Sequence, residues 1–136
     1  MKHLMLDTNV YTAFKRNDSK VLSLIRQADS MAINTVVLGE LLAGFKGGSR
    51  ETRNRHELDL FLDSPRVQVL TLDETTAEFF ALVFHNLRLA GKPIPVNDIW
   101  IAASTMQHGL TLATLDAHFA HVNGLSLHPA LEGSIP

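Results

Sequence analysis

The sequence His3-Leu4-Met5-Leu6 is a short apolar run that stops abruptly at Asp7-Thr8-Asn9, an acid, a hydroxyl and an amide. A run this short, followed at once by a helical pattern, predicts a central strand that is buried on both faces. Asp7 would then lie at the carboxyl end of that strand, the edge at which open parallel sheets bind their ligands. The alternative is that Asp7 only caps the next helix, a role that Asp, Thr and Asn all fill well.

The composition predicts an ordinary globular domain. The chain has 136 residues, of which 46% are hydrophobic, so we expect a single domain over residues 1–136 with a substantial core. It contains no cysteine, which excludes disulfides, thiolate zinc sites and thiol catalysis. The net charge of -2 argues against a protein that coats nucleic acid by general electrostatic attraction, but permits a nuclease that carries its own acidic site.

The sequence shows no targeting or membrane signal. Its amino terminus lacks the basic region and long apolar stretch of a signal peptide, and no apolar run approaches the ~20 residues needed to span a bilayer. We therefore expect a cytoplasmic protein with no membrane partner.

Strand and helix patterns alternate along the chain. Further strands are expected at residues 31–36, 67–72, 110–115 and 125–127, with helical patterns between them. Thr35 is expected to cap the helix around Leu41, and Thr75 with Glu78 to form a capping box for the helix around Phe80. The alternation indicates βαβ units, and hence an α/β domain of three layers (α/β/α) with a mainly parallel, twisted sheet of four to five strands.

Three acids occupy positions that suit chemistry. Asp7 and Asp116 each follow an apolar strand, and Asp98 lies in the first turn of a helix that is apolar almost all round. Carboxylates that converge in a partly dry cleft repel one another unless a cation neutralises them. Oxygen ligands suit Mg²⁺ or Mn²⁺, so the favoured reaction class is metal-assisted attack of water on a phosphodiester.

Glu40 is a weaker candidate by pattern alone. The apolar residues of its helix leave it on the opposite face, so periodicity predicts a solvated glutamate. Periodicity does not say whether that face borders the cleft, and Gly44, one turn further on, would allow a substrate or another chain to approach closely.

Four motifs, taken together, resemble those of a known family. They are Leu4-Met5-Leu6-Asp7-Thr8-Asn9, Asn34 to Gly44 with Glu40, Asn97-Asp98-Ile99-Trp100-Ile101-Ala102-Ala103, and Ala113-Thr114-Leu115-Asp116-Ala117-His118-Phe119. In this order, and over nearly the whole chain, they resemble the PIN-domain nucleases, most of all the VapC-type toxins of bacterial and archaeal toxin-antitoxin pairs.

The resemblance implies a fold, an activity and partners. The fold would be PIN-like, and the activity that of an endoribonuclease dependent on Mg²⁺ or Mn²⁺, which leaves a 3′-hydroxyl and a 5′-phosphate on its RNA products. The acidic site would consist of Asp7, Glu40, Asp98 and Asp116, with Thr8, Asn9 and Thr114 orienting the carboxylates or a bound water. Asp7, Asp98 and Asp116 would bind metal, and Glu40 would bind it directly or position the attacking water. The protein would form a homodimer, and a cognate antitoxin would block the site.

Other residues are weaker candidates. His118 and His121, three residues apart, are interpreted as surface or packing residues rather than metal ligands. Trp100 is interpreted as a core residue rather than a base-stacking platform. A basic run such as that from Lys46 to His56 usually forms a solvated face. Its cations could nevertheless contact RNA or the antitoxin; they are Lys46, Arg50, Arg53 and Arg55.

Two other functions are weighed against the nuclease. A phospho-accepting signalling domain also places acids at strand ends, but it needs two adjacent acids after its first strand, where this chain has Asp7-Thr8-Asn9. A PIN-like module that binds RNA or protein without catalysis remains the other alternative. Metal-dependent cleavage of a mixed RNA pool would separate all three.

Overall fold

The computed structural model describes residues 2–129, which form alternating strands and helices. In chain order these are β1 (His3–Leu6), α1 (Thr8–Lys15), α2 (Ser19–Gln27), β2 (Ser30–Asn34), α3 (Thr35–Lys46), α4 (Glu51–Leu62), β3 (Val67–Leu70), α5 (Glu74–Leu89), α6 (Val96–Gln107), β4 (Thr111–Ala113) and the 3-10 helix η1 (Ala117–His121). None of the helices in this part of the chain has the length and apolar character that crossing a membrane requires.

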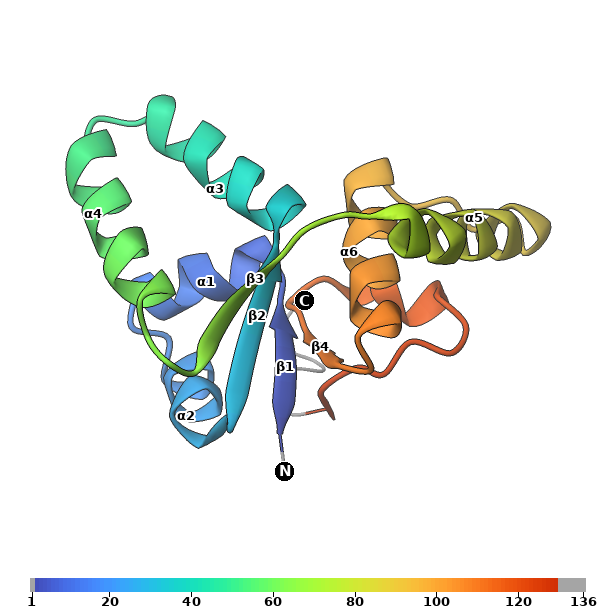
Figure 1. Ribbon diagram of the computed structural model, residues 1–136, viewed down its shortest axis with the longest axis horizontal. Coiled ribbons are helices and arrows are strands. Elements are labelled where there is room, and N and C mark those ends of the chain that lie inside the picture. Colours follow the sequence, from blue (N-terminus) through green and yellow to red (C-terminus); the bar gives the residue numbers. More distant parts are fainter. Residues whose placement is uncertain (1, 130–136) are drawn as a thin grey trace.

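The strands form one parallel sheet in the order β3-β2-β1-β4. Helices α1 to α4 lie on one side of this sheet, and α5 and α6 lie on the other (Figure 1). Strand β1 is central, and its apolar residues Leu4, Met5 and Leu6 are at most 1% exposed. The predicted three-layer α/β fold and the buried first strand are therefore confirmed.

The strand expected at residues 125–127 is wrong. Leu127 makes only an isolated parallel bridge to Leu112, so the sheet has four strands within the described residues. The reason is that β4 is only three residues long, and Leu112 alone pairs with this segment: its N–H donates to Ser126 O at 2.8 Å, and its carbonyl accepts from His128 N at 2.9 Å.

The strands expected at 31–36, 67–72 and 110–115 end earlier than the apolar pattern suggested, because polar side chains cap the next helices. Asn34, not Thr35, caps α3, with its Oδ1 accepting from Val37 N. The capping box of α5 joins Asp73 and Thr76, not Thr75 and Glu78. Both predicted caps were therefore displaced, by one residue at α3 and by two at α5.

Trp100 packs at the contact between α5 and α6. Its ring is stacked on Phe80, with 4.1 Å between the centroids, and is partly buried. Trp100 thus packs against Phe80 but is not one of the buried core residues, although the sequence had predicted it to be one.

Asn34 fastens the two helical layers together at the carboxyl edge of the sheet. It is fully buried, and its Nδ2 donates to Ser104 Oγ at 3.0 Å and to the Trp100 carbonyl at 3.4 Å, both on α6. Because Asn34 also caps α3, one side chain fixes the start of that helix relative to α6. Glu40 lies on α3 and Asp98 on α6, so this link bears directly on the site described below.

Replacing Asn34 by Ala should destabilise the protein by roughly 2 to 4 kcal/mol, since it removes a helix cap and leaves the buried Ser104 hydroxyl without this partner. Urea denaturation measures the change. Asp18→Ala, which removes only the α2 cap bond to Val21 N, is the matched control and should cost about 1 kcal/mol. Equal losses for the two variants would contradict the linking role of Asn34.

Candidate active site

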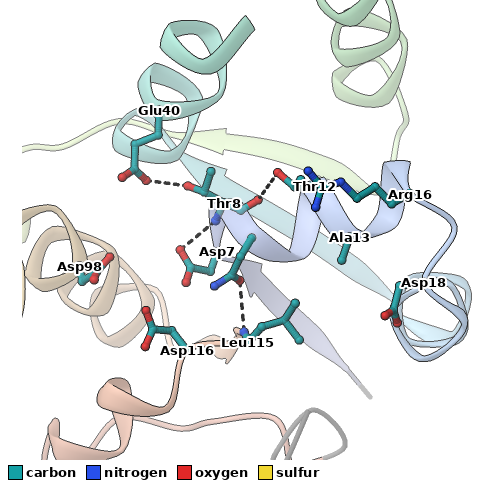
Figure 2. A pocket seen from close by; sticks show the side chains of 11 residues that line it. Asp7, Thr8, Thr12, Ala13, Arg16, Asp18, Glu40, Asp98, Leu115 and Asp116 are labelled. Carbon is teal, nitrogen blue, oxygen red and sulfur yellow. Dashed lines mark hydrogen bonds between the residues drawn. The ribbon is translucent and has the colours of Figure 1, made fainter. Parts of the chain in front are cut away.

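An acidic cleft of about 660 Å³ opens at the carboxyl edge of the sheet. Figure 2 shows the carboxylates that line it, which are Asp18 at the start of α2 and four others contributed by segments far apart in the sequence. Asp7 follows β1, Glu40 lies on α3, Asp98 lies in the first turn of α6, and Asp116 precedes η1. The structure thus brings together all four acids that the sequence analysis singled out.

Asp7 is the most buried of the four, with 5% of its surface exposed. Its Oδ1 accepts from Thr8 N at 2.8 Å, and its Oδ2 accepts from the Thr114 hydroxyl at 2.7 Å. It is also the N-cap residue of α1. The two interpretations offered for Asp7 are therefore compatible, because one carboxylate caps the helix and lines the cleft.

Burial raises the pKa of Asp7 to about 6, even though the hydrogen bonds from Thr114 and Thr8 act in the opposite direction. The negative charges of Asp98 and Glu40 raise the pKa further. Burial likewise raises the pKa of Asp98, against the lowering influence of His118. Ionisation of these carboxylates in the cleft therefore lowers the folding stability of the free protein.

Glu40 is half-buried in the cleft wall. The periodicity of its helix had predicted a solvated glutamate, and this prediction is wrong. Its Oε1 accepts from the Thr8 hydroxyl at 2.6 Å, and its Oε2 accepts from Asn97 Nδ2 at 3.4 Å. The periodicity failed here because the face of α3 opposite the core borders the cleft. Thr8 links two acids, since its N–H binds Asp7 and its hydroxyl binds Glu40.

Thr114 and Asn9 fix the loop that carries Asp116. The Thr114 hydroxyl donates to Asp7 and accepts from Asp116 N at 3.0 Å. Asn9 Oδ1 accepts from Leu115 N at 3.2 Å, so this side chain holds the loop and is hydrogen-bonded to none of the acids. Thr8 and Thr114 therefore contact the acids directly, whereas Asn9 acts on the backbone beside them.

His118 is a site residue that the sequence analysis placed elsewhere. Its Nε2 lies 2.7 Å from Asp98 Oδ2, and its Nδ1 lies 2.8 Å from Asp116 Oδ1. The interpretation of His118 as a surface or packing residue therefore missed its contacts with two acids of the site. The signal available in the sequence was its position two residues after Asp116, where a 3-10 turn brings the ring back over that carboxylate.

The basic run predicted to contact RNA or antitoxin does not line this cleft. Lys46 at the end of α3, and Arg53 and Arg55 on α4, form ion pairs with acids of α4, and Arg50 precedes α4. The basic side chain among the lining residues is instead Arg16, an exposed residue at the end of α1 (Figure 2).

The donor set fits a divalent cation. The hydrogen-bond partners of the four carboxylates are backbone amides, hydroxyls, an amide side chain and an imidazole, and no Lys or Arg in residues 2–129 forms an ion pair with them. Carboxylates left without cationic side chains in a partly buried cleft are suited to a hard metal ion. The ligand atoms of Asp98, Asp116 and His118 all lie within 4.8 Å of one another.

Comparison with known proteins defines the class. A family model described as PIN domain matches residues 4–125. The chain belongs to the PIN domain family. Within it, the chain is similar to ribonuclease VapC2 of Rickettsia felis, with 31% identity over 114 residues that cover 81% of this chain and 84% of the relative. Ribonuclease VapC4 of Mycobacterium tuberculosis is 34% identical over 88 residues, covering 65% of this chain and 68% of the relative.

Solved structures agree with this assignment. A VapBC2 structure from Rickettsia felis, bound to a promoter DNA fragment, superposes with a TM-score of 0.81 and 25% identity, covering 93% of this chain and 97% of the other. VapBC-5 of Mycobacterium tuberculosis, from a family of toxin-antitoxin systems, gives a TM-score of 0.73 with 26% identity, covering 93% and 94%. The resemblance drawn from the four motifs is thus confirmed, and the phospho-accepting signalling domain is contradicted.

The raised pKa of Asp7 predicts a pH-dependent stability. In metal chelator the folded state holds the proton of Asp7 more tightly than the unfolded chain, so stability should fall as pH rises from about 4 to about 6. Asp7→Asn removes this charge, and at about pH 7 it should be more stable than the parent by roughly 1 to 3 kcal/mol.

Urea denaturation in chelator at several pH values measures the effect. Asp63→Asn, an exposed aspartate at the end of α4, is the control and should leave the pH profile of stability unchanged. An Asp7→Asn variant with the parent's pH profile would contradict the burial of a titrating carboxylate.

Proposed function

We propose that this protein is a metal-dependent endoribonuclease and the toxin of a type II toxin-antitoxin pair. The observation that carries the proposal is the convergence of Asp7, Glu40, Asp98 and Asp116 in one cleft of a PIN-domain fold. The ribonuclease names of relatives that align over most of this chain support the same activity.

The metal would be Mg²⁺ or Mn²⁺, held by Asp7, Asp98 and Asp116. When bound, such an ion would stabilise the negative charge that develops on the phosphate oxygens while water displaces the leaving oxygen. Glu40 would bind the ion or position the attacking water. Its Oε1 is fixed by the Thr8 hydroxyl, which leaves Oε2, held only by a long contact to Asn97, as the atom to accept a proton from that water.

Hydrolysis in this arrangement breaks the bond between phosphorus and the 3′ oxygen. Water adds its oxygen to the phosphorus, one of its protons passes to a base, and the leaving 3′ oxygen gains a proton. The products are a 3′-hydroxyl and a 5′-phosphate, as the family resemblance implies. The carboxylates themselves stay unmodified, because they act by position and charge.

Arg16 is the residue we propose to hold the RNA backbone. It lines the acidic cleft and also a neighbouring cavity of about 210 Å³ between α1, α3 and α4. A guanidinium at the rim of a cleft full of carboxylates offers a place for a phosphate next to the one that is cleaved. The basic residues Lys46, Arg50, Arg53 and Arg55 remain predicted contacts for RNA or for the antitoxin.

The partners proposed are an antitoxin and a second copy of this chain. Structures of VapBC complexes that match over most of this chain support the antitoxin, since one of them is described as a member of a family of toxin-antitoxin systems. The homodimer follows from the family resemblance. Incubating the purified protein with a mixed RNA pool, with and without Mg²⁺ or Mn²⁺, tests the activity directly, and absence of cleavage with either ion would contradict it.

Asp98→Asn should lower RNA cleavage by at least ~10²-fold, because a lost metal ligand removes stabilisation of developing charge. In chelator the same variant should be as stable as the parent or more so, since it relieves repulsion with neighbouring carboxylates. Cleavage assays and thermal unfolding in chelator measure the two effects, with Asp63→Asn as control. A variant that is less stable in chelator and cleaves at the parent's rate would mean that Asp98 only serves the start of α6.

Arg16→Ala should raise KM for RNA several-fold with a smaller change in kcat, and should flatten the salt dependence of binding by a slope of about 0.7, the value for one phosphate contact on a single strand. Binding is measured by fluorescence anisotropy on the Asp98→Asn background, so that RNA stays intact.

The control for Arg16→Ala is Arg26→Ala. Arg26 is an exposed arginine in the last turn of α2, outside the cleft, so its replacement should leave the KM for RNA and the salt dependence of binding unchanged. The triple replacement of Arg50, Arg53 and Arg55 by Ala extends the comparison to the basic run. If that triple variant alone changes the salt slope and Arg16→Ala does not, the RNA path runs along α4.

A further inference from the structure

We propose that His118 provides a nitrogen ligand to the metal, and that the site therefore selects a first-row transition ion over Mg²⁺. This inference rests on the proposed metal-dependent function and specifies its ion. The observation behind it is the contact of one imidazole with two carboxylates of the cleft, Asp98 and Asp116.

The separations suit a shared ion. In octahedral coordination with bonds of about 2.1 Å, adjacent ligand atoms lie about 3.0 Å apart. His118 Nε2 lies 2.7 Å from Asp98 Oδ2, which is close to that spacing before any ion draws the two atoms into its shell. Little movement of either side chain would be needed to place an ion between them and the cleft.

The two nitrogens have different surroundings, and these assign their roles. Asp116 Oδ1 accepts a hydrogen bond from the backbone N–H of His118 at 3.3 Å, and the ring nitrogen Nδ1 of the same residue lies 2.8 Å from that oxygen. Both contacts belong to the turn between Asp116 and His118. Asp98 Oδ2 has only the His118 ring as its partner among the described residues. In the tautomer that carries its proton on Nδ1, facing Asp116 Oδ1, the lone pair of Nε2 is left for an ion shared with Asp98.

A ligating histidine generally donates its other ring N–H to a carboxylate, which fixes the ring and strengthens the ligand. Asp116 supplies that acceptor here. The remaining oxygen of Asp116 and the carboxylate of Asp7 would complete the protein's share of the shell. This donor set contains one imidazole among carboxylates, and imidazole favours transition ions such as Co²⁺, whereas Mg²⁺ takes oxygen ligands.

The experiment measures ion affinity directly, without RNA. Calorimetry with Co²⁺, Mn²⁺ and Mg²⁺ gives the affinities, and the visible absorption of bound Co²⁺ reports a nitrogen ligand. The parent should bind Co²⁺ more tightly than Mg²⁺. His118→Ala should lose at least ~10-fold in Co²⁺ affinity and change its absorption, with a smaller effect on Mg²⁺. His118→Gln offers an oxygen near the place of Nε2, so it should regain Mg²⁺ binding more than Co²⁺ binding.

His121→Ala is the matched control, because His121 is an exposed histidine of the same 3-10 helix. It should leave all three affinities unchanged, and unfolding in chelator checks that each variant folds. Equal Co²⁺ affinity in the parent and in His118→Ala would overturn the inference. A tighter Co²⁺ complex in His118→Ala would also overturn it, since the imidazole would then occupy the ion's place.

The failure of this inference and the failure of the proposed function have different signatures. Normal metal-dependent RNA cleavage with unchanged ion selectivity in His118→Ala contradicts only the role of His118. A parent protein that selects Co²⁺ through His118 but cleaves no RNA with any of the three ions contradicts the endoribonuclease and leaves the ion site standing.

Discussion

The hydroxyl of Thr114 is the interaction on which the site depends. It donates to Asp7 Oδ2 and accepts from Asp116 N, so it joins the ends of the neighbouring strands β1 and β4. The pairing of Leu6 with Ala113 sets this geometry, because the residues that follow each of them emerge side by side at the carboxyl edge. Without this register, the buried carboxylate of Asp7 would lose a hydrogen bond that offsets part of its desolvation.

Apart from His118, the side chains that hydrogen-bond to the four acids are neutral. Thr8 binds both Asp7 and Glu40, Asn97 reaches Glu40, and ion pairs of Lys and Arg lie elsewhere, chiefly along α4. Hydroxyls and amides orient a carboxylate without cancelling its charge. The pKa of Asp7 and of Asp98 is raised chiefly by burial and to a smaller extent by repulsion among the carboxylates, and a bound cation would relieve that repulsion.

Local pattern predicted the elements of the fold better than their ends. The apolar runs located β1 to β4, but the strand at 125–127 failed because pairing needs a partner with free backbone groups, and β4 offered only Leu112. The caps at Asn34 and Asp73 were misplaced because several hydroxyl and acidic residues lie at each boundary. Which of them caps depends on tertiary contacts, such as those of Asn34 with Ser104 and of Asp73 with Gln107.

The sequence by itself determined the alternation of strands and helices, the buried first strand and the candidacy of Asp7, Asp98 and Asp116, because apolar period and position after a strand are local properties. Glu40 came from family resemblance, since its own periodicity predicted a solvated side chain. Only the tertiary structure decided that its face of α3 borders the cleft, that Arg16 lies at the rim and that His118 spans Asp98 and Asp116. The hydrogen bonds of the site join Asp98 to His118, Thr8 to Glu40 and Asp7 to Thr114, which are 20, 32 and 107 positions apart. Such pairings are set by sheet register and helix packing, which no short stretch of sequence encodes.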